Sequence, residues 1–110
     1  MTSPTRSALD DYQDAAARTI NQSLTEEQRL LDAAAGLAEE AGEVLAHVRK
    51  HVMQHRPLDR DAVAIELGDA LWCIAVAARS IGLTLSDVAC RNVSKLAARH
   101  PKGFSGTSAD

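Results

Sequence analysis

The stretch from Val63 to Ile81, V-A-I-E-L-G-D-A-L-W-C-I-A-V-A-A-R-S-I, decides the fold. Apolar side chains surround most of a helix drawn through it, and a helix that is apolar nearly all round is a buried helix. Glu66 lies about 160° from Gly68, which belongs to the narrow polar edge of that helix. A carboxylate that points into an apolar surface is rare unless a positive group compensates it. The stretch therefore predicts a core helix that carries an unusual acidic side chain.

Outward from this stretch, the sequence predicts helices and no strand. Apolar residues at helical spacing favour four helices over residues 7–21, 25–54, 60–80 and 85–99. Thr25 followed by Gln28 is typical of a capping box, and Thr84 with Asp87 resembles another cap. Asp59 is a suitable N-cap, and Gly82 is a suitable C′ residue. We expect an all-α, four-helix bundle-like protomer. One domain over residues 7–104 is expected, between a flexible N-terminus (1–6) and a flexible tail (105–110).

Composition limits the classes of partner. The chain has 110 residues, 45% of them apolar, and a net charge of −3, which argues against a general nucleic-acid surface. No apolar run is long enough for a membrane span, and the N-terminus lacks the apolar core of a signal peptide. Cys73 and Cys90 stand apart in apolar helical sequence, which predicts two buried thiols. A cytoplasmic protein with no nucleic-acid or membrane partner is expected.

Two acidic pairs indicate the chemistry. Glu40 and Glu43 form an E-x-x-E in the second predicted helix, and Glu66 and Asp69 form an E-x-x-D in the third. Residues three apart share a helix face, so each motif presents two carboxylates side by side. Like charges this close repel unless a cation lies between them. Two facing pairs would form an all-oxygen cage, which suits Mg²⁺, with Mn²⁺ as a possible substitute.

Other interpretations of these residues fit the sequence less well. A single acidic pair on a helix is usually a solvated face, but Glu66 on an apolar helix argues against that interpretation. A di-iron bundle needs Glu-x-x-His on two helices, and the chain has no such pair. His47, His51 and His55 form a stripe, which we interpret as solvent-facing or part of an interface rather than as a zinc site.

The fourth predicted helix carries the opposite charge. Asn92, Lys95 and Arg99 lie on one face, and side chains of these types bind phosphate. Taken alone, this face is an ordinary helix surface. Beside a metal cage, it is the donor face that a polyphosphate substrate requires.

Three segments together resemble a known family. G-L-A-E-E-A-G-E-V, E-L-G-D-A-L-W and R-N-V-S-K-L-A-A-R-H-P-K-G-F are similar to the MazG-like all-α nucleoside triphosphate pyrophosphohydrolases. The resemblance runs from about Tyr12 to Phe104. It implies a metal site at Glu40, Glu43, Glu66 and Asp69, phosphate contacts from Asn92 and Lys95, and an oligomer with sites near the interface. Cys73 departs from the family, which often has an aromatic residue after the tryptophan, so nucleobase preference is not carried over.

The predicted function follows from the motifs and the resemblance together. We expect Mg²⁺-dependent hydrolysis of (deoxy)nucleoside triphosphates to a nucleoside monophosphate and pyrophosphate, as nucleotide-pool housekeeping. Asn92, Lys95 and Arg99 would bind the phosphates, and the general base is not assigned. The alternative is a non-catalytic helical module that binds nucleotide or mediates interactions. Because one chain is too small to cover its third helix, a homo-oligomer, dimer or tetramer, is also expected.

Overall fold

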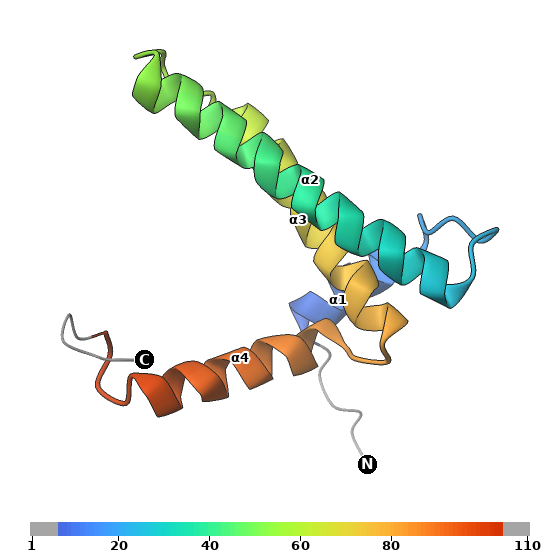
Figure 1. Cartoon of the computed structure of the whole chain (residues 1–110). Helices are drawn as coiled ribbons and strands as arrows, with labels where there is room; N and C mark the ends of the chain where they lie inside the picture. The colour runs from blue at the N-terminus through green and yellow to red at the C-terminus, as the bar shows by residue number, and fades with distance from the viewer. Residues whose placement is uncertain (1–6, 105–110) are drawn as a thin grey trace.

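The computed structural model describes residues 7–104, and every regular element in that range is a helix (Figure 1). The helices are α1 (Ala8–Ala17), α2 (Glu26–Met53), α3 (Arg60–Ser80) and α4 (Leu85–Arg99). The all-α prediction with four helices is confirmed. The segments expected to be flexible, 1–6 and 105–110, lie outside the described residues. Across the described residues, no helix is both long and apolar enough to span a bilayer.

Side-chain caps set most of the helix ends where the sequence predicts them. Thr25 and Gln28 form a capping box at the start of α2, and Thr84 and Asp87 form another at the start of α4. The Asp59 carboxylate accepts a hydrogen bond from the Ala62 N–H at the start of α3. These contacts supply acceptors for N–H groups that a helix cannot satisfy internally.

The end of α3 is also as predicted. Gly82 has a φ of +80°, a conformation that favours glycine. The Leu83 N–H donates to the Ala78 carbonyl at 2.9 Å, and the Gly82 N–H donates to the Arg79 carbonyl. These two bonds form a Schellman motif, which turns the chain toward α4.

The prediction for the first helix is wrong at its C-terminal end. α1 ends at Ala17, and residues up to Ile20 follow in tight turns. The Thr19 hydroxyl donates to the Ala16 carbonyl and accepts from the Trp72 indole N–H at 2.7 Å. Hydroxyl side chains that bond the local backbone compete with the helix, so the chain leaves the helical path here.

α2 and α3 form a long antiparallel arm (Figure 1). Gly36 does not kink α2, which continues unbroken to Met53. Instead, Gly36 lets the helices approach closely, because a Cβ at this position would lie 2.9 Å from the Cys73 Sγ atom. Cys73 is buried as predicted, whereas Cys90 on α4 is exposed, so the prediction of two buried thiols is half wrong.

A small core holds α1, α3 and the start of α4 together. Its buried members are Ala16, Ala75 and Leu85, with Tyr12 and Trp72 packed against them. Small residues allow helices to approach closely, which fits the alanine-rich composition. The arm leaves this corner in one direction and α4 leaves it in another.

Gln13 fixes the corner with hydrogen bonds. Its side chain is only 6% exposed, and its amide donates to the carbonyls of Ala75 and Leu83. Its carbonyl accepts from the backbone N–H of Leu85 at 3.0 Å. One side chain from α1 therefore holds the end of α3 and the start of α4.

The chain is open rather than compact. Its radius of gyration is 17.3 Å, against about 13 Å for a compact domain of this length. In the described part of the chain, α4 contacts α1 and α3 but not α2. Apolar side chains of α3 therefore remain exposed, so the burial expected for this helix is incomplete within one chain; they include Ile65, Leu67, Leu71 and Ile74.

Candidate metal centre

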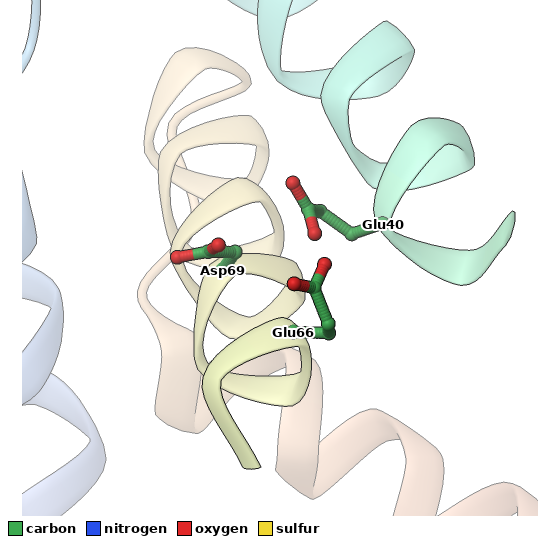
Figure 2. A group of neighbouring side chains, drawn as sticks. All are labelled: Glu40, Glu66 and Asp69. Carbon is green, nitrogen blue, oxygen red and sulfur yellow. The ribbon is translucent and has the colours of Figure 1, made fainter. Parts of the chain in front are cut away.

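Three of the four predicted carboxylates meet between α2 and α3. One carboxylate oxygen from each of Glu40, Glu66 and Asp69 lies within 4.8 Å of the other two. Figure 2 shows Glu40 reaching from α2 toward the two acidic residues of α3. The i, i+3 spacing of Glu66 and Asp69 puts both on one helix face, and the close α2–α3 approach brings Glu40 across to them.

Glu40 has the most constrained environment of the three. Glu40 and Glu66 are half-buried, and Asp69 is exposed. The Glu40 Oε2 atom is buried and has no hydrogen-bond partner among the described residues. Carboxylates only accept hydrogen bonds unless one of them is protonated, so Glu66 satisfies Glu40 only through a shared proton.

This arrangement changes the acidity of Glu40. The hydrogen bond that a shared proton makes with Glu66 raises the pKa of Glu40 to about 7, and desolvation and the negative charges of Glu66, Asp69 and Glu39 act in the same direction. A cation would replace that proton and remove the repulsion. The site therefore suits a hard divalent cation. Its carboxylate oxygens are clustered, their negative charges repel one another, and one buried oxygen has no hydrogen-bond partner.

Glu43 does not join the cluster. It is exposed on α2 and is absent from the group of mutually close carboxylates in the described residues. Glu39 is exposed as well. Sequence reasoning singled out Glu66 as the inward carboxylate, whereas the structure gives Glu40 the buried oxygen without a partner. Helical wheels order residues on one helix, but they do not show how closely a second helix approaches.

The histidine stripe is not part of the centre. None of its three members belongs to the carboxylate group. His51 is exposed, and its Nδ1 atom lies 2.6 Å from the Arg56 carbonyl oxygen. Since a carbonyl only accepts, Nδ1 carries the hydrogen, and His51 serves to close the turn after α2.

The predicted phosphate-binding residues lie away from the carboxylates in one chain. Asn92, Lys95 and Arg99 are exposed along α4, and α4 makes no contact with α2 in the described range. Figure 1 shows α4 diverging from the α2–α3 arm. The structure therefore brings together three of the four predicted metal ligands but does not bring the donor face to them.

Tyr12 on α1 lies near enough to Asp69 to be affected by its charge. Burial raises the pKa of the Tyr12 phenol, and the Asp69 carboxylate adds to this rise. The Trp72 indole, by contrast, is engaged by Thr19. Cys73 packs on Gly36 between the helices, so the position where the family often has an aromatic residue does not open to this surface.

Comparison with known proteins identifies the family of this chain. A model of the family described as "MazG nucleotide pyrophosphohydrolase domain" matches residues 28–104, which include every carboxylate of the cluster. The chain is 35% identical over 79 residues to the "Gene 37 protein" of Mycobacterium phage L5, covering 68% of this chain and 69% of the phage protein. No solved structure matches the chain. The chain belongs to the MazG nucleotide pyrophosphohydrolase domain family.

Proposed function

We propose that this protein is a Mg²⁺-dependent enzyme that hydrolyses nucleoside triphosphates to nucleoside monophosphates and pyrophosphate. The observation that carries the proposal is the carboxylate cluster of Glu40, Glu66 and Asp69, with its buried unpartnered oxygen, in a chain of this family. Nucleotide-pool housekeeping in the cytoplasm is the role we propose, and two free cysteines fit a reducing compartment.

The site has the character that Mg²⁺ prefers. All three side chains offer oxygen ligands, and the exposed Asp69 leaves one side accessible to water and to a substrate. Mg²⁺ held there would supply Lewis acidity, which neutralises phosphate oxygens and makes a nearby water more acidic. Mn²⁺ would satisfy the same donor set.

The side chains of the chain divide the remaining work. Glu40, Glu66 and Asp69 would hold the cation, and Glu43 would complete the ligand set. The attacking water forms a bond to phosphorus, the α–β phosphoanhydride bond breaks, and the water proton passes to a carboxylate. A carboxylate oxygen of Glu43 or Glu39, the nearest acidic residues along α2 outside the cluster, is the candidate for the base.

Asn92, Lys95 and Arg99 bind the phosphates and the pyrophosphate leaving group in this proposal. Because they lie away from the cluster in a single chain, we place their contacts in a homo-oligomer, dimer or tetramer. A second copy packed against the exposed apolar side of α3 would bring further helices to the site. The donor face of one copy can then serve the carboxylates of another.

Substitution of the cluster tests the proposal directly. Glu66→Gln and Asp69→Asn keep the size of each side chain but remove its charge, so pyrophosphate release from nucleoside triphosphates should fall on the order of 100-fold or more. Circular dichroism should show the helical content unchanged. Glu27→Gln is the matched control, because Glu27 is exposed in the first turn of α2 and lies outside the carboxylate group. Full activity in both cluster variants would refute the metal assignment.

Thermal melts separate catalysis from simple binding. Mg²⁺ with a triphosphate should raise the melting temperature of the wild type and not of Glu66→Gln. Nucleotide-dependent stabilisation without pyrophosphate release, across canonical and modified triphosphates, would instead support a non-catalytic binding module.

A further inference from the structure

The contact between Gly36 and Cys73 lies one helical turn from the carboxylate cluster. On α2, Gly36 precedes Glu40 by four residues, and on α3, Cys73 follows Asp69 by four. Because α2 and α3 run antiparallel, both steps lead in the same direction, about 6 Å along the arm (Figure 1). The cluster and the contact are therefore neighbours within one helix–helix interface.

Each helix places its cluster carboxylates and its packed residues on one face. Residues that follow one another at steps of three and four share a helix face. The separation that packing imposes on the two helices is therefore also the separation of the carboxylates. The members of these faces are Glu66, Asp69, Cys73 and Val76 on α3, and Ala33, Gly36 and Glu40 on α2.

Gly36 allows this separation to be small. An added Cβ at Gly36 would lie 2.9 Å from the Cys73 Sγ atom, whereas one at Gly42 or Gly68 would meet no atom within 4 Å. Glycine inside a helix lowers its stability relative to alanine, so its presence calls for a packing reason. Gly36 has that reason within the chain, because the distance between packed helices depends on the side chains at their contact.

Cys73 serves at this contact as a small apolar side chain rather than as a ligand. Burial raises the pKa of its thiol, and among the neighbouring charges that of Glu40 adds most to this rise. A neutral thiol packs like a small apolar group. Cys73 also lies outside the group of mutually close ligand atoms in the described residues. Its effect on the centre is therefore through the distance between the helices.

The widening that a side chain at position 36 would require matches the difference in size between two ions. Atoms in ordinary contact are about 3.5–4 Å apart, so a Cβ at 2.9 Å from the sulfur calls for a shift of about 0.5–1 Å. Mg²⁺ binds oxygen at about 2.0–2.1 Å and Ca²⁺ at about 2.3–2.6 Å. Ligands on opposite sides of an ion must therefore separate by about 0.5–1 Å to accept Ca²⁺ in place of Mg²⁺.

We propose that Gly36 and Cys73 are positioning residues that set the size of the carboxylate cluster and thereby favour Mg²⁺ over the larger Ca²⁺. They act by holding α2, which carries Glu40, close to α3, which carries Glu66 and Asp69. The inference rests on the metal centre of the proposed function, and it adds the residues that select the ion.

Metal binding without nucleotide tests this role. Electron paramagnetic resonance of Mn²⁺ measures the bound ion, and competition with Mg²⁺ and with Ca²⁺ gives the affinity for each. In Gly36→Ala, the affinity for Mg²⁺ should fall about tenfold, while that for Ca²⁺ should change by less than about twofold. In a Cys73→Ala background, Gly36→Ala should leave the ratio of the two affinities at its wild-type value, because the added Cβ no longer meets the sulfur.

The controls separate a change in ion size preference from a general loss of binding. Gly42→Ala is the matched control, because its Cβ meets no atom of the chain within 4 Å, and it should keep the wild-type ratio. Glu66→Gln should lose Mn²⁺ binding, which identifies the measured site as the cluster. If Gly36→Ala does not fold, Cys73→Val crowds the same contact from α3 and should lower the ratio in the same way.

The outcomes distinguish this role from the proposed function. An unchanged ratio in Gly36→Ala would overturn the inference, and so would a lowered ratio that Cys73→Ala does not restore. Equal Mn²⁺ binding in Glu66→Gln and wild type would overturn the metal centre and the inference together. Wild-type protein that shows the expected ratios but releases no pyrophosphate would support the inference and count against the proposed activity alone.

Discussion

The Glu40 carboxylate determines how the centre responds to pH. Its pKa is raised to about 7, first by the hydrogen bond with Glu66 and then by desolvation and neighbouring negative charge. Metal binding requires the carboxylate without its proton, so Mg²⁺ and the proton compete for it. The apparent affinity for Mg²⁺ should therefore rise about tenfold per pH unit below pH 7 and level off above it.

Calorimetric titration between pH 5.5 and 8.5 measures this slope. Glu40→Gln removes the titrating group, so binding should be weaker and its pH dependence flatter. Glu39→Gln should keep the wild-type slope, because it contributes only one of the smaller charges around Glu40. An unchanged slope in Glu40→Gln would show that another group controls binding.

The same group affects the stability of the metal-free protein with the opposite sign. A carboxylate whose folded pKa is above its unfolded value holds its proton more tightly in the folded state. The contribution of Glu40 to the free energy of unfolding is full below its ordinary pKa of 4.5 and is lost as the pH rises to about 7. The free energy of unfolding without Mg²⁺ should fall over that range in wild type, and this component should be missing in Glu40→Gln, as measured by urea denaturation.

At the scale of the elements, Gln13 is the side chain that joins three helices. Gln13→Leu would keep a similar volume but leave the carbonyls of Ala75 and Leu83 and the Leu85 N–H without this partner. Leaving buried polar groups unsatisfied costs about 1–3 kcal/mol each. After the surrounding structure relaxes, Gln13→Leu should therefore lower the free energy of unfolding by about 3 kcal/mol. Urea denaturation should show it, while Gln22→Leu on the exposed loop should change stability by less than about 0.5 kcal/mol.

The approach of α2 to α3 gives a second prediction at this scale. Gly36→Ala introduces a Cβ 2.9 Å from the Cys73 sulfur, so the helices must separate or the sulfur must move. Overpacking of this kind costs about 1–3 kcal/mol. Cys73→Ala removes the sulfur, and in that background Gly36→Ala should cost much less. A double-mutant cycle by thermal or urea unfolding measures the coupling, and additive effects would contradict direct contact.

The limits of sequence reasoning are clearest at this scale. The caps at Thr25, Asp59 and Thr84 could be predicted because each is a local pattern with a local physical cause. The end of α1 could not be predicted, because Thr19 is held by Trp72, a residue far away in the sequence.

The candidate site could be predicted in part. The motif spacing predicted Glu40, Glu66 and Asp69 as partners, but the exposure of Glu43 depends on how two helices pack.

In the whole molecule, the open shape leads us to expect that copies of the chain associate. Leu67, Leu71 and Ile74 are exposed along α3, and the side of the arm that they form is not covered by α4 within the described residues. Surfaces of this kind are rarely left in water, because burying them against a second copy removes apolar area from solvent. The sequence predicts association because one chain is too small to cover the third helix, but a helical wheel does not show which α3 side chains stay exposed within the chain.

Association through the exposed side of α3 should change both the mass and the thermal stability of the protein. Sedimentation velocity should give a mass that is a multiple of the 11.7 kDa chain, and the melting temperature should rise with protein concentration because association stabilises the folded state. Leu71→Lys should lower both the mass and the melting temperature, since a charge buried at an interface is costly. Gln22→Lys, an exposed substitution of equal charge away from α3, is the control. In a monomer, Leu71→Lys would have no more effect than Gln22→Lys, because both positions would face water.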